Sequence, residues 1–80
     1  MHLDIITPEE TVFSGEIKLI RVPGTKGSFE VLQNHAPLIS TLEKGDIKVI
    51  EKSDKESHFQ INGGVIEVRE NKIIVLGDFV

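Results

Sequence analysis

The sequence of 80 residues has no cysteine, tryptophan or tyrosine and only one alanine, Ala36. Without cysteine, neither a disulfide framework nor a thiolate metal site is possible. No apolar run approaches the roughly 20 residues that a membrane-spanning helix needs, and the N-terminus lacks the pattern of a signal peptide. We therefore expect a soluble protein that reaches a membrane only through a partner.

Positive charge and aromatic side chains are also scarce. Nine basic residues stand against thirteen acidic ones, which gives a formal net charge of -4, and the basic residues form no cluster along the chain. The only aromatic residues are four phenylalanines. Nucleic-acid binding needs a basic surface, and single strands also need aromatic side chains on which bases stack. Nucleic acid is therefore excluded as an expected partner.

The length limits the chain to one domain, which we expect to cover residues 1–80. A chain this short buries only roughly 60% of the surface that its unfolded form exposes. Such a domain is marginally stable alone and often gains stability from contact with other subunits.

The residues that are abundant predict an all-β fold. The sequence holds eleven isoleucines and eight valines, and these β-branched side chains favour strands over helices. Short segments alternate apolar and polar residues, which is typical of strands with one buried face. These segments are residues 2–5, 16–19, 28–31, 46–49, 58–61, 66–69 and 73–76.

Residues typical of turns separate these segments. They are Ser14-Gly15, Pro23-Gly24, Lys44-Gly45, Ser53-Asp54, Asn62-Gly63-Gly64 and Glu70-Asn71-Lys72. Many short strands with turns at close intervals predict an antiparallel sandwich or barrel.

Two segments have some helical character. Thr7-Pro8-Glu9-Glu10 has the form of a capping box, but Val12, Phe13 and Gly15 follow too soon for more than about one turn of helix. We therefore predict a tight turn there. In the segment 37–43, Leu38 and Leu42 are four residues apart, although the β-branched residues nearby favour a strand.

The stretch GTKGSFEVLQNHAPL, residues 24–38, contains glycine, lysine and serine, as phosphate-binding loops do. In a P-loop the lysine directly follows the second glycine, and a hydroxyl residue comes next. Here Lys26 precedes Gly27, so the spacing excludes a P-loop. Pro23-Gly24 and Gly27 instead indicate β-turns.

No pattern of residues indicates a metal site or a catalytic site. His2, His35 and His58 are far apart in the sequence, whereas zinc needs three or four converging ligands. Ser28, Ser40 and His35 are candidates for nucleophilic catalysis by residue type alone, and the neighbours Glu9 and Glu10 point to opposite faces of an extended chain. We expect no cofactor, no metal and no catalytic residue.

Residues 27–38, GSFEVLQNHAPL, closely resemble a signature of the epsilon subunit of F-type ATP synthases, which typically reads Gly-x-Leu-Gly-Ile-Leu-Pro-Asn-His-Ala-Pro-Leu. Four further segments resemble that family in the same order along the chain. They are Val12–Glu16, Lys44-Gly45, Ile61–Val68 and Val75–Asp78.

The resemblance implies a ten-stranded antiparallel β-sandwich and a role in the rotor of a proton- or sodium-translocating ATP synthase. It implies a non-catalytic subunit of the central stalk that contacts the gamma subunit and the c-ring, and through them the alpha/beta catalytic head. The expected location is the cytoplasmic face of the inner membrane, or the equivalent organellar face. Longer relatives carry a C-terminal two-helix hairpin, which these 80 residues do not include.

The same resemblance implies which residues contact the gamma subunit and the c-ring. They are Gly27, Ser28, His35, Ala36, Pro37 and Leu38. Ser28 stands where relatives often have a glutamate, Glu30 replaces a usual glycine, and Gln33 replaces a usual proline.

Two questions remain open at the level of the sequence. Ile20 and Val22 lie on the opposite face of their strand from Leu19. They either form an outward apolar face for gamma or belong to a strand buried on both sides. A free-standing sandwich that binds a small ligand or a peptide strand at a sheet edge is the alternative function.

Overall fold

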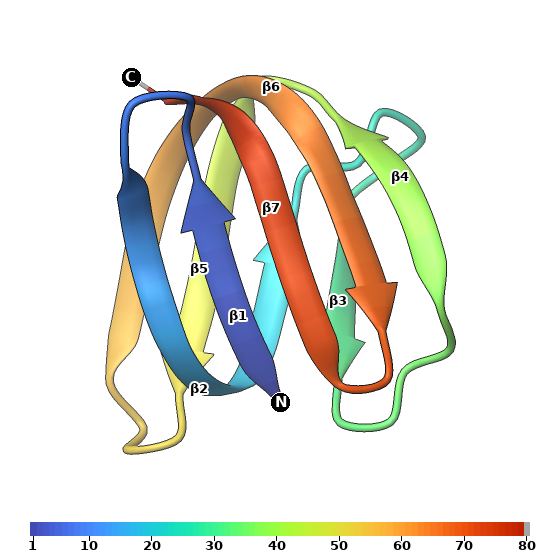
Figure 1. Ribbon diagram of the computed structural model, residues 1–80. Coiled ribbons are helices and arrows are strands. Elements are labelled where there is room, and N and C mark those ends of the chain that lie inside the picture. The colour runs from blue at the N-terminus through green and yellow to red at the C-terminus, as the bar shows by residue number, and fades with distance from the viewer. Residues whose placement is uncertain (80) are drawn as a thin grey trace.

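The computed structural model describes residues 1–79 and contains seven β-strands and no helix in that range (Figure 1). The all-β prediction is confirmed. Alternating side chains of the strands face a shared core, as the β-branched composition predicts. The strands are β1 (His2–Ile6), β2 (Thr11–Val22), β3 (Phe29–Leu32), β4 (Leu38–Leu42), β5 (Gly45–Glu51), β6 (Glu56–Arg69) and β7 (Lys72–Phe79).

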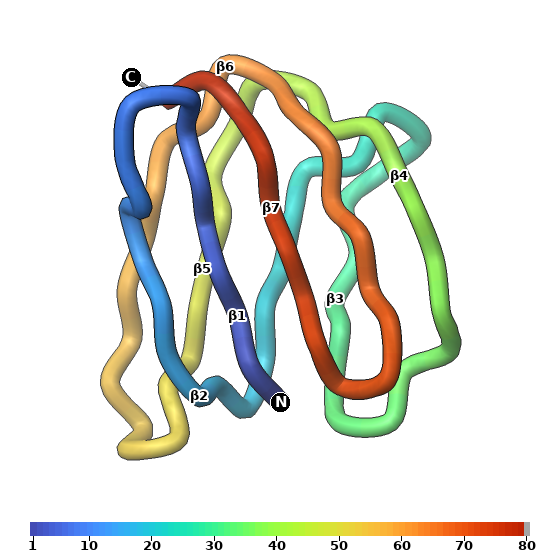
Figure 2. The backbone as a smooth tube through the Cα atoms, in the orientation of Figure 1, coloured from blue at the N-terminus to red at the C-terminus, as the bar shows by residue number. Residues whose placement is uncertain are grey.

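The strands form two layers that face each other across the core (Figure 1). The first layer holds β3, the second half of β2, β5 and the first half of β6. The second layer holds β4, the second half of β6, β7, β1 and the first half of β2. Two long strands, β2 and β6, therefore run without interruption through both layers (Figure 2).

The prediction of ten antiparallel strands is wrong in two respects. The structure describes seven strands, because β2 and β6 each serve in both layers, and β1 pairs with β7 in parallel. The predicted turns at Ser14-Gly15 and Asn62-Gly63-Gly64 lie inside these two long strands. Their glycines allow bends and close backbone approach within a continuous strand.

The core lies between the layers and is made of aliphatic side chains from all seven strands. The edge strands β3 and β4 contribute one buried residue each, and the other strands contribute two or three. Its buried members are Leu3, Ile5, Ile17, Ile20, Val22, Val31, Leu42, Ile47, Val49, Ile61, Ile66, Val68, Ile73 and Val75. On the partly exposed margin, Phe13 and Phe59 meet edge to face, with ring centroids 5.9 Å apart.

The short connections confirm most of the predicted turns. Glu70 and Asn71 have φ angles of 50° and 61° and join the paired residues Arg69 and Lys72, as in a type I′ hairpin turn. Between β1 and β2, the Thr7 side-chain oxygen accepts hydrogen bonds from the backbone N–H groups of Glu9 (3.3 Å) and Glu10 (3.0 Å). This is the predicted tight turn.

One side of the sandwich is open because β3 and β4, the edge strands of the two layers, do not pair with each other. The loop after β2 lies along the end of β4 instead. The N–H of Thr25 donates to the Thr41 carbonyl (3.1 Å), and the N–H of Glu43 donates to the Pro23 carbonyl (2.8 Å). These bonds cover part of the outer edge of β4, which limits pairing with another strand there.

Among residues 1–79, the structure has no helix of the length and apolar character that crossing a bilayer requires.

Candidate functional site

The residues predicted to contact gamma and the c-ring fall into two groups at opposite ends of β3. Gly27 and Ser28 precede this strand, whereas His35, Ala36 and Pro37 follow it. Figure 1 shows the two loops at opposite ends of the sandwich. The four residues of β3 span about 13 Å at the usual rise of a strand. The stretch 27–38 therefore contributes to two separate surfaces, one at each end of β3.

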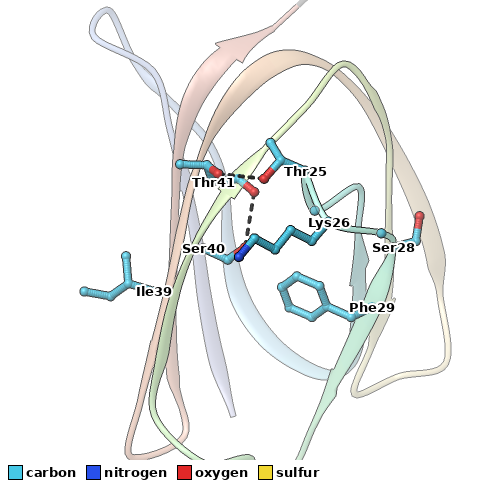
Figure 3. Close-up of a pocket in the computed structure, with 9 residues that line it drawn as sticks. Thr25, Lys26, Ser28, Phe29, Ile39, Ser40 and Thr41 are labelled. Carbon is cyan, nitrogen blue, oxygen red and sulfur yellow. Dashed lines mark hydrogen bonds between the residues drawn. The ribbon is translucent and has the colours of Figure 1, made fainter.

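The first surface is the loop that precedes β3. Gly27 has a φ of 124°, a conformation that favours glycine, and Ser28 is exposed. The loop borders a cavity of about 620 Å³ between itself and β4, and the side chain of Lys26 extends across this cavity towards Ser40 (Figure 3). The lining combines one cation and several hydroxyl groups with the apolar side chains of Phe29 and Ile39.

The second surface is the loop 33–37 and the start of β4. The Nδ1 atom of His35 lies 2.7 Å from the carbonyl oxygen of Ala36, so the ring is held against its own loop. Ala36 and Pro37 are exposed. Pro37 and Leu38 border an apolar groove of about 410 Å³ whose other wall is the end of β6.

Leu38 differs from the other predicted contact residues because it is partly buried and packs against the core. Its side chain therefore supports the fold as well as the groove. A substitution at Leu38 changes stability and surface together, so it is a poor probe of docking alone.

Of the two alternatives for Ile20 and Val22, the structure excludes an outward apolar face. Ile20 and Val22 are fully buried, at 0% exposure, so the interpretation of these residues as an outward face is wrong. They face the core because β2 has already entered the first layer at that point, where β5 and β3 flank it.

The outward apolar residues gather on the second layer instead. The exposed fractions are 73% for Ile39, 52% for Leu76 and 37% for Val65. The strand register places Val65 beside Leu76, and Leu76 beside Ile6. We call this set the apolar face; it comprises Ile6, Ile39, Val65, Ile74 and Leu76.

Grooves border the apolar face at both ends. The groove at Pro37 and Leu38 includes Ile39, and a second groove of about 610 Å³ is bordered by Ile6 and Leu76. Within the face, Glu67 lies between Ile39 and Ile74 in the register. A surface that gathers exposed apolar side chains in this way is typical of a protein contact.

Sequence reasoning missed two histidines that bridge pairs of carboxylates. His2 Nδ1 lies 3.0 Å from Glu16 Oε2, and His2 Nε2 lies 3.2 Å from Asp4 Oδ1. These hydrogen bonds, to Glu16 first and Asp4 second, raise the pKa of His2 above its ordinary value. The hydroxyl of Ser14 donates to Asp4 at 2.6 Å and lowers the pKa of that carboxyl.

His58 has the same arrangement on the first layer. Its Nδ1 lies 2.7 Å from Asp46 Oδ2 and its Nε2 lies 2.6 Å from Glu56 Oε2. The hydrogen bonds to Asp46 and Glu56 raise the pKa of His58. In both clusters the ring separates the two carboxylates, and among residues 1–79 no group of side chains is arranged to hold a metal ion. The spacings His2/Asp4 and Glu56/His58 are the signal in the sequence, because residues two apart share a strand face.

The candidate nucleophiles and base are not brought together. Ser28 and Ser40 border the cavity beside the first surface, whereas His35 lies beyond the other end of β3. A serine nucleophile needs a base within hydrogen-bonding distance. In the described part of the chain, His35 has a hydrogen bond only within its own loop.

Comparisons with known proteins agree with the fold and with the motifs. An epsilon chain of the ATP synthase from Chlorobaculum tepidum is 46% identical over 74 residues, which cover 92% of this chain and 84% of that protein. The epsilon chain from Bordetella avium is 36% identical over 78 residues, which cover 98% of this chain and 55% of that protein. The chain thus spans about half the length of several of the relatives that it matches.

Solved structures show the same fold at low sequence identity. A chain of the mitochondrial ATP synthase of Euglena gracilis superposes with a TM-score of 0.87 at 21% identity, over 94% of this chain and 48% of that one. A chain of the central stalk and c-ring of the Tetrahymena thermophila mitochondrial ATP synthase has a TM-score of 0.80 at 19% identity, over 98% and 63%.

The family model of the ATP synthase delta/epsilon chain β-sandwich domain matches residues 1–80. Because this match spans the full sequence and a relative is 46% identical, the chain belongs to the family of ATP synthase delta/epsilon chain β-sandwich domains.

Proposed function

We propose that this chain is part of the central stalk of an F-type ATP synthase and transmits rotation from the c-ring to the gamma subunit. The observation that carries the proposal is the match of residues 1–80 to the delta/epsilon β-sandwich family. In this role the chain performs no bond chemistry and needs no cofactor. Its partners are gamma and the c-ring, and indirectly the alpha/beta head.

The two surfaces at the ends of β3 suit two different partners. We assign Gly27 and Ser28, with the cavity beside them, to contact with the c-ring. We assign His35, Ala36, Pro37 and Leu38 to contact with gamma, together with the adjacent apolar face. Because β3 separates the two loops, each partner has its own contact area.

The apolar face supports the assignment of a stable protein contact. Stable protein interfaces bury roughly 1,200 Å² or more in total, and their centres are apolar. The apolar face continues into grooves at both ends, and Glu67 within it has no ion pair among residues 1–79. A partner with apolar side chains and a basic residue opposite Glu67 would complement this surface.

The sandwich also suits the transmission of force. Its fourteen buried apolar side chains are packed between two layers, and close-packed interiors deform little under load. The continuous strands β2 and β6 connect the layers through the backbone. The location follows from the assembly: the chain lies at the cytoplasmic face of the membrane, or the equivalent organellar face, and is held there by its partners.

A pair of leucines with equal exposure tests the assignment of the apolar face. Leu76 lies on that face and Leu32 lies on the first layer, and each is 52% exposed. We expect Leu76→Ser to weaken binding to purified gamma about tenfold or more, because it places a hydroxyl in the apolar contact. Leu32→Ser is the matched control and should bind as the wild type does.

Three outcomes decide the proposal. Selective loss of gamma binding in Leu76→Ser supports it. Equal binding by both variants overturns the assignment of the face, and absence of gamma binding by the wild-type subunit overturns the proposed function. In that last case, recovery of a small molecule or an extended peptide from native extract would favour a free-standing binding domain.

A further inference from the structure

The loop that carries His35 is connected to the second layer by a pair of asparagines. The backbone N–H of Asn34 donates to Asn71 Oδ1 at 2.7 Å, and Asn71 Nδ2 donates to Asn34 Oδ1 at 3.1 Å. Asn34 belongs to the loop between β3 and β4, and Asn71 to the turn between β6 and β7. We call these two residues the asparagine pair.

Both members of the asparagine pair have backbone conformations that suit asparagine. Asn34 has a φ of 65° and Asn71 a φ of 61°, in the left-handed region that asparagine tolerates better than most residues. The N–H of His35 donates to the Leu32 carbonyl at 3.1 Å, so Asn34 is the third residue of a four-residue turn. The two turns thus present their amide groups to each other.

The asparagine pair compensates for the missing contact between β3 and β4. These strands are edges of different layers and share no backbone hydrogen bonds. At the other end of the open side, the backbone bridge from Gly24 to Leu42 and the 2.8 Å contact between the hydroxyls of Thr25 and Thr41 connect the layers. The asparagine pair is the counterpart of these contacts at the end where His35 lies.

The hydrogen bonds of His35 are local. Among residues 1–79, its ring is bonded to the carbonyl of Ala36, in the same loop, and its backbone N–H donates to the carbonyl of Leu32, the last residue of β3. Neither hydrogen bond reaches the second layer. The loop joins that layer through the chain at Leu38, where β4 begins, and through Gln33, whose Oε1 accepts a hydrogen bond from the Met1 amino group at 3.1 Å. The asparagine pair adds the connection between the middle of the loop and the turn after β6.

We propose that Asn71 is a positioning residue for the contact with gamma: through Asn34 it holds the loop of His35, Ala36 and Pro37 beside the apolar face. This inference rests on the proposed function. Asn71 itself is half-buried in the turn after β6 and lies outside the stretch 27–38. A preorganised loop binds with less loss of conformational freedom, so freeing the loop should weaken binding.

The test uses the complete subunit with three variants. Asn71→Gly removes the amide but keeps the left-handed conformation accessible. Asn71→Asp retains an oxygen acceptor for the N–H of Asn34 and loses only the second hydrogen bond. Thr25→Val removes the surface hydrogen bond to Thr41 at the opposite end of the open side, in the loop before β3, and serves as the matched control.

Two readouts are measured for each variant: hydrogen exchange of the Asn34 amide, and affinity for purified gamma. In Asn71→Gly we expect exchange of Asn34 to become about tenfold faster and affinity to fall by about three- to tenfold, as for the loss of one surface hydrogen bond. Asn71→Asp should be intermediate. Thr25→Val should leave both readouts unchanged.

The inference is overturned by unchanged exchange at Asn34 in Asn71→Gly, or by faster exchange with full affinity for gamma. An equal loss of affinity in Thr25→Val also overturns it, because the effect would then be general. If the wild-type subunit does not bind gamma, the proposed function fails, whereas faster exchange would still show that Asn71 orders the loop.

Discussion

Gly64 in β6 lies directly against the main chain of Leu76 in β7. A Cβ atom on Gly64 would be 2.3 Å from the Leu76 carbonyl oxygen and 2.9 Å from the Cα of Gly77. Both obstacles are backbone atoms, which a change of rotamer cannot move. Glycine at this position therefore lets β6 approach β7 where β6 passes from the first layer to the second.

We expect Gly64→Ala to lower the free energy of unfolding by about 1–3 kcal/mol or more, the usual cost of overpacking. Gly63→Ala is the matched control, because a Cβ there would make only an ordinary contact of 3.6 Å with the Leu42 carbonyl oxygen. Urea unfolding followed by circular dichroism measures both. Similar stability of the two variants would contradict the close approach at Gly64.

The turn between β6 and β7 offers a stabilising substitution. Glu70 has a φ of 50°, and a left-handed conformation costs a residue with a long side chain roughly 1 kcal/mol. Asparagine is favoured at this position of a type I′ turn. We expect Glu70→Asn to raise stability by about 0.5–1 kcal/mol, which corresponds to a rise in Tm of a few degrees.

Glu70→Ala is the control for that substitution. It removes the same negative charge. Alanine does not favour the left-handed conformation, so the conformational cost remains. Thermal unfolding should show a gain for asparagine and none for alanine. A gain of equal size in both would mean that charge, and not turn geometry, limits the stability of this hairpin.

The two histidine clusters predict a fall in stability between about pH 6 and pH 8. Hydrogen bonds to carboxylates raise the pKa of His2 and of His58 in the folded state. The stabilisation is fully present below the unfolded pKa, near 6.5, and is lost as the pH rises through the higher folded pKa. Tm measured across this range should therefore decrease with pH.

Replacing both histidines by glutamine should flatten that part of the pH profile, since neither cluster can then gain a proton. High salt should weaken the dependence in the wild type because the clusters are exposed. A wild-type Tm that rises between pH 6 and pH 8 would contradict the prediction.

His35 and Leu38 are expected to respond differently to alanine. His35→Ala removes a partly exposed ring whose contacts are confined to its loop, so we expect about tenfold weaker binding to gamma with little change in Tm. Leu38→Ala should also lower the free energy of unfolding by about 1–3 kcal/mol, because Leu38 packs on the core. Titration with gamma and thermal unfolding separate these effects, and a large loss of Tm in His35→Ala would contradict the first.

Local chemistry was sufficient to predict several parts of the fold. The turn at Thr7–Glu10 has its hydrogen bonds between neighbouring residues, and the turn at Glu70-Asn71 depends on the conformations of those two residues. Such features depend on residues a few positions apart. The candidate site was predictable only as a stretch of sequence, since its division into two surfaces depends on the direction and length of β3.

The sequence alone determined the all-β class, the positions of most turns and the family, because β-branched composition, apolar alternation and ordered motifs need no knowledge of distant contacts. Only the tertiary structure decided that Gly15 and Gly64 lie within strands, that Ile20 and Val22 are buried, and that the exposed apolar residues gather on the second layer. The physical reason is that a glycine or an aliphatic side chain takes its role from what packs against it. Here those neighbours come from strands far away in the chain.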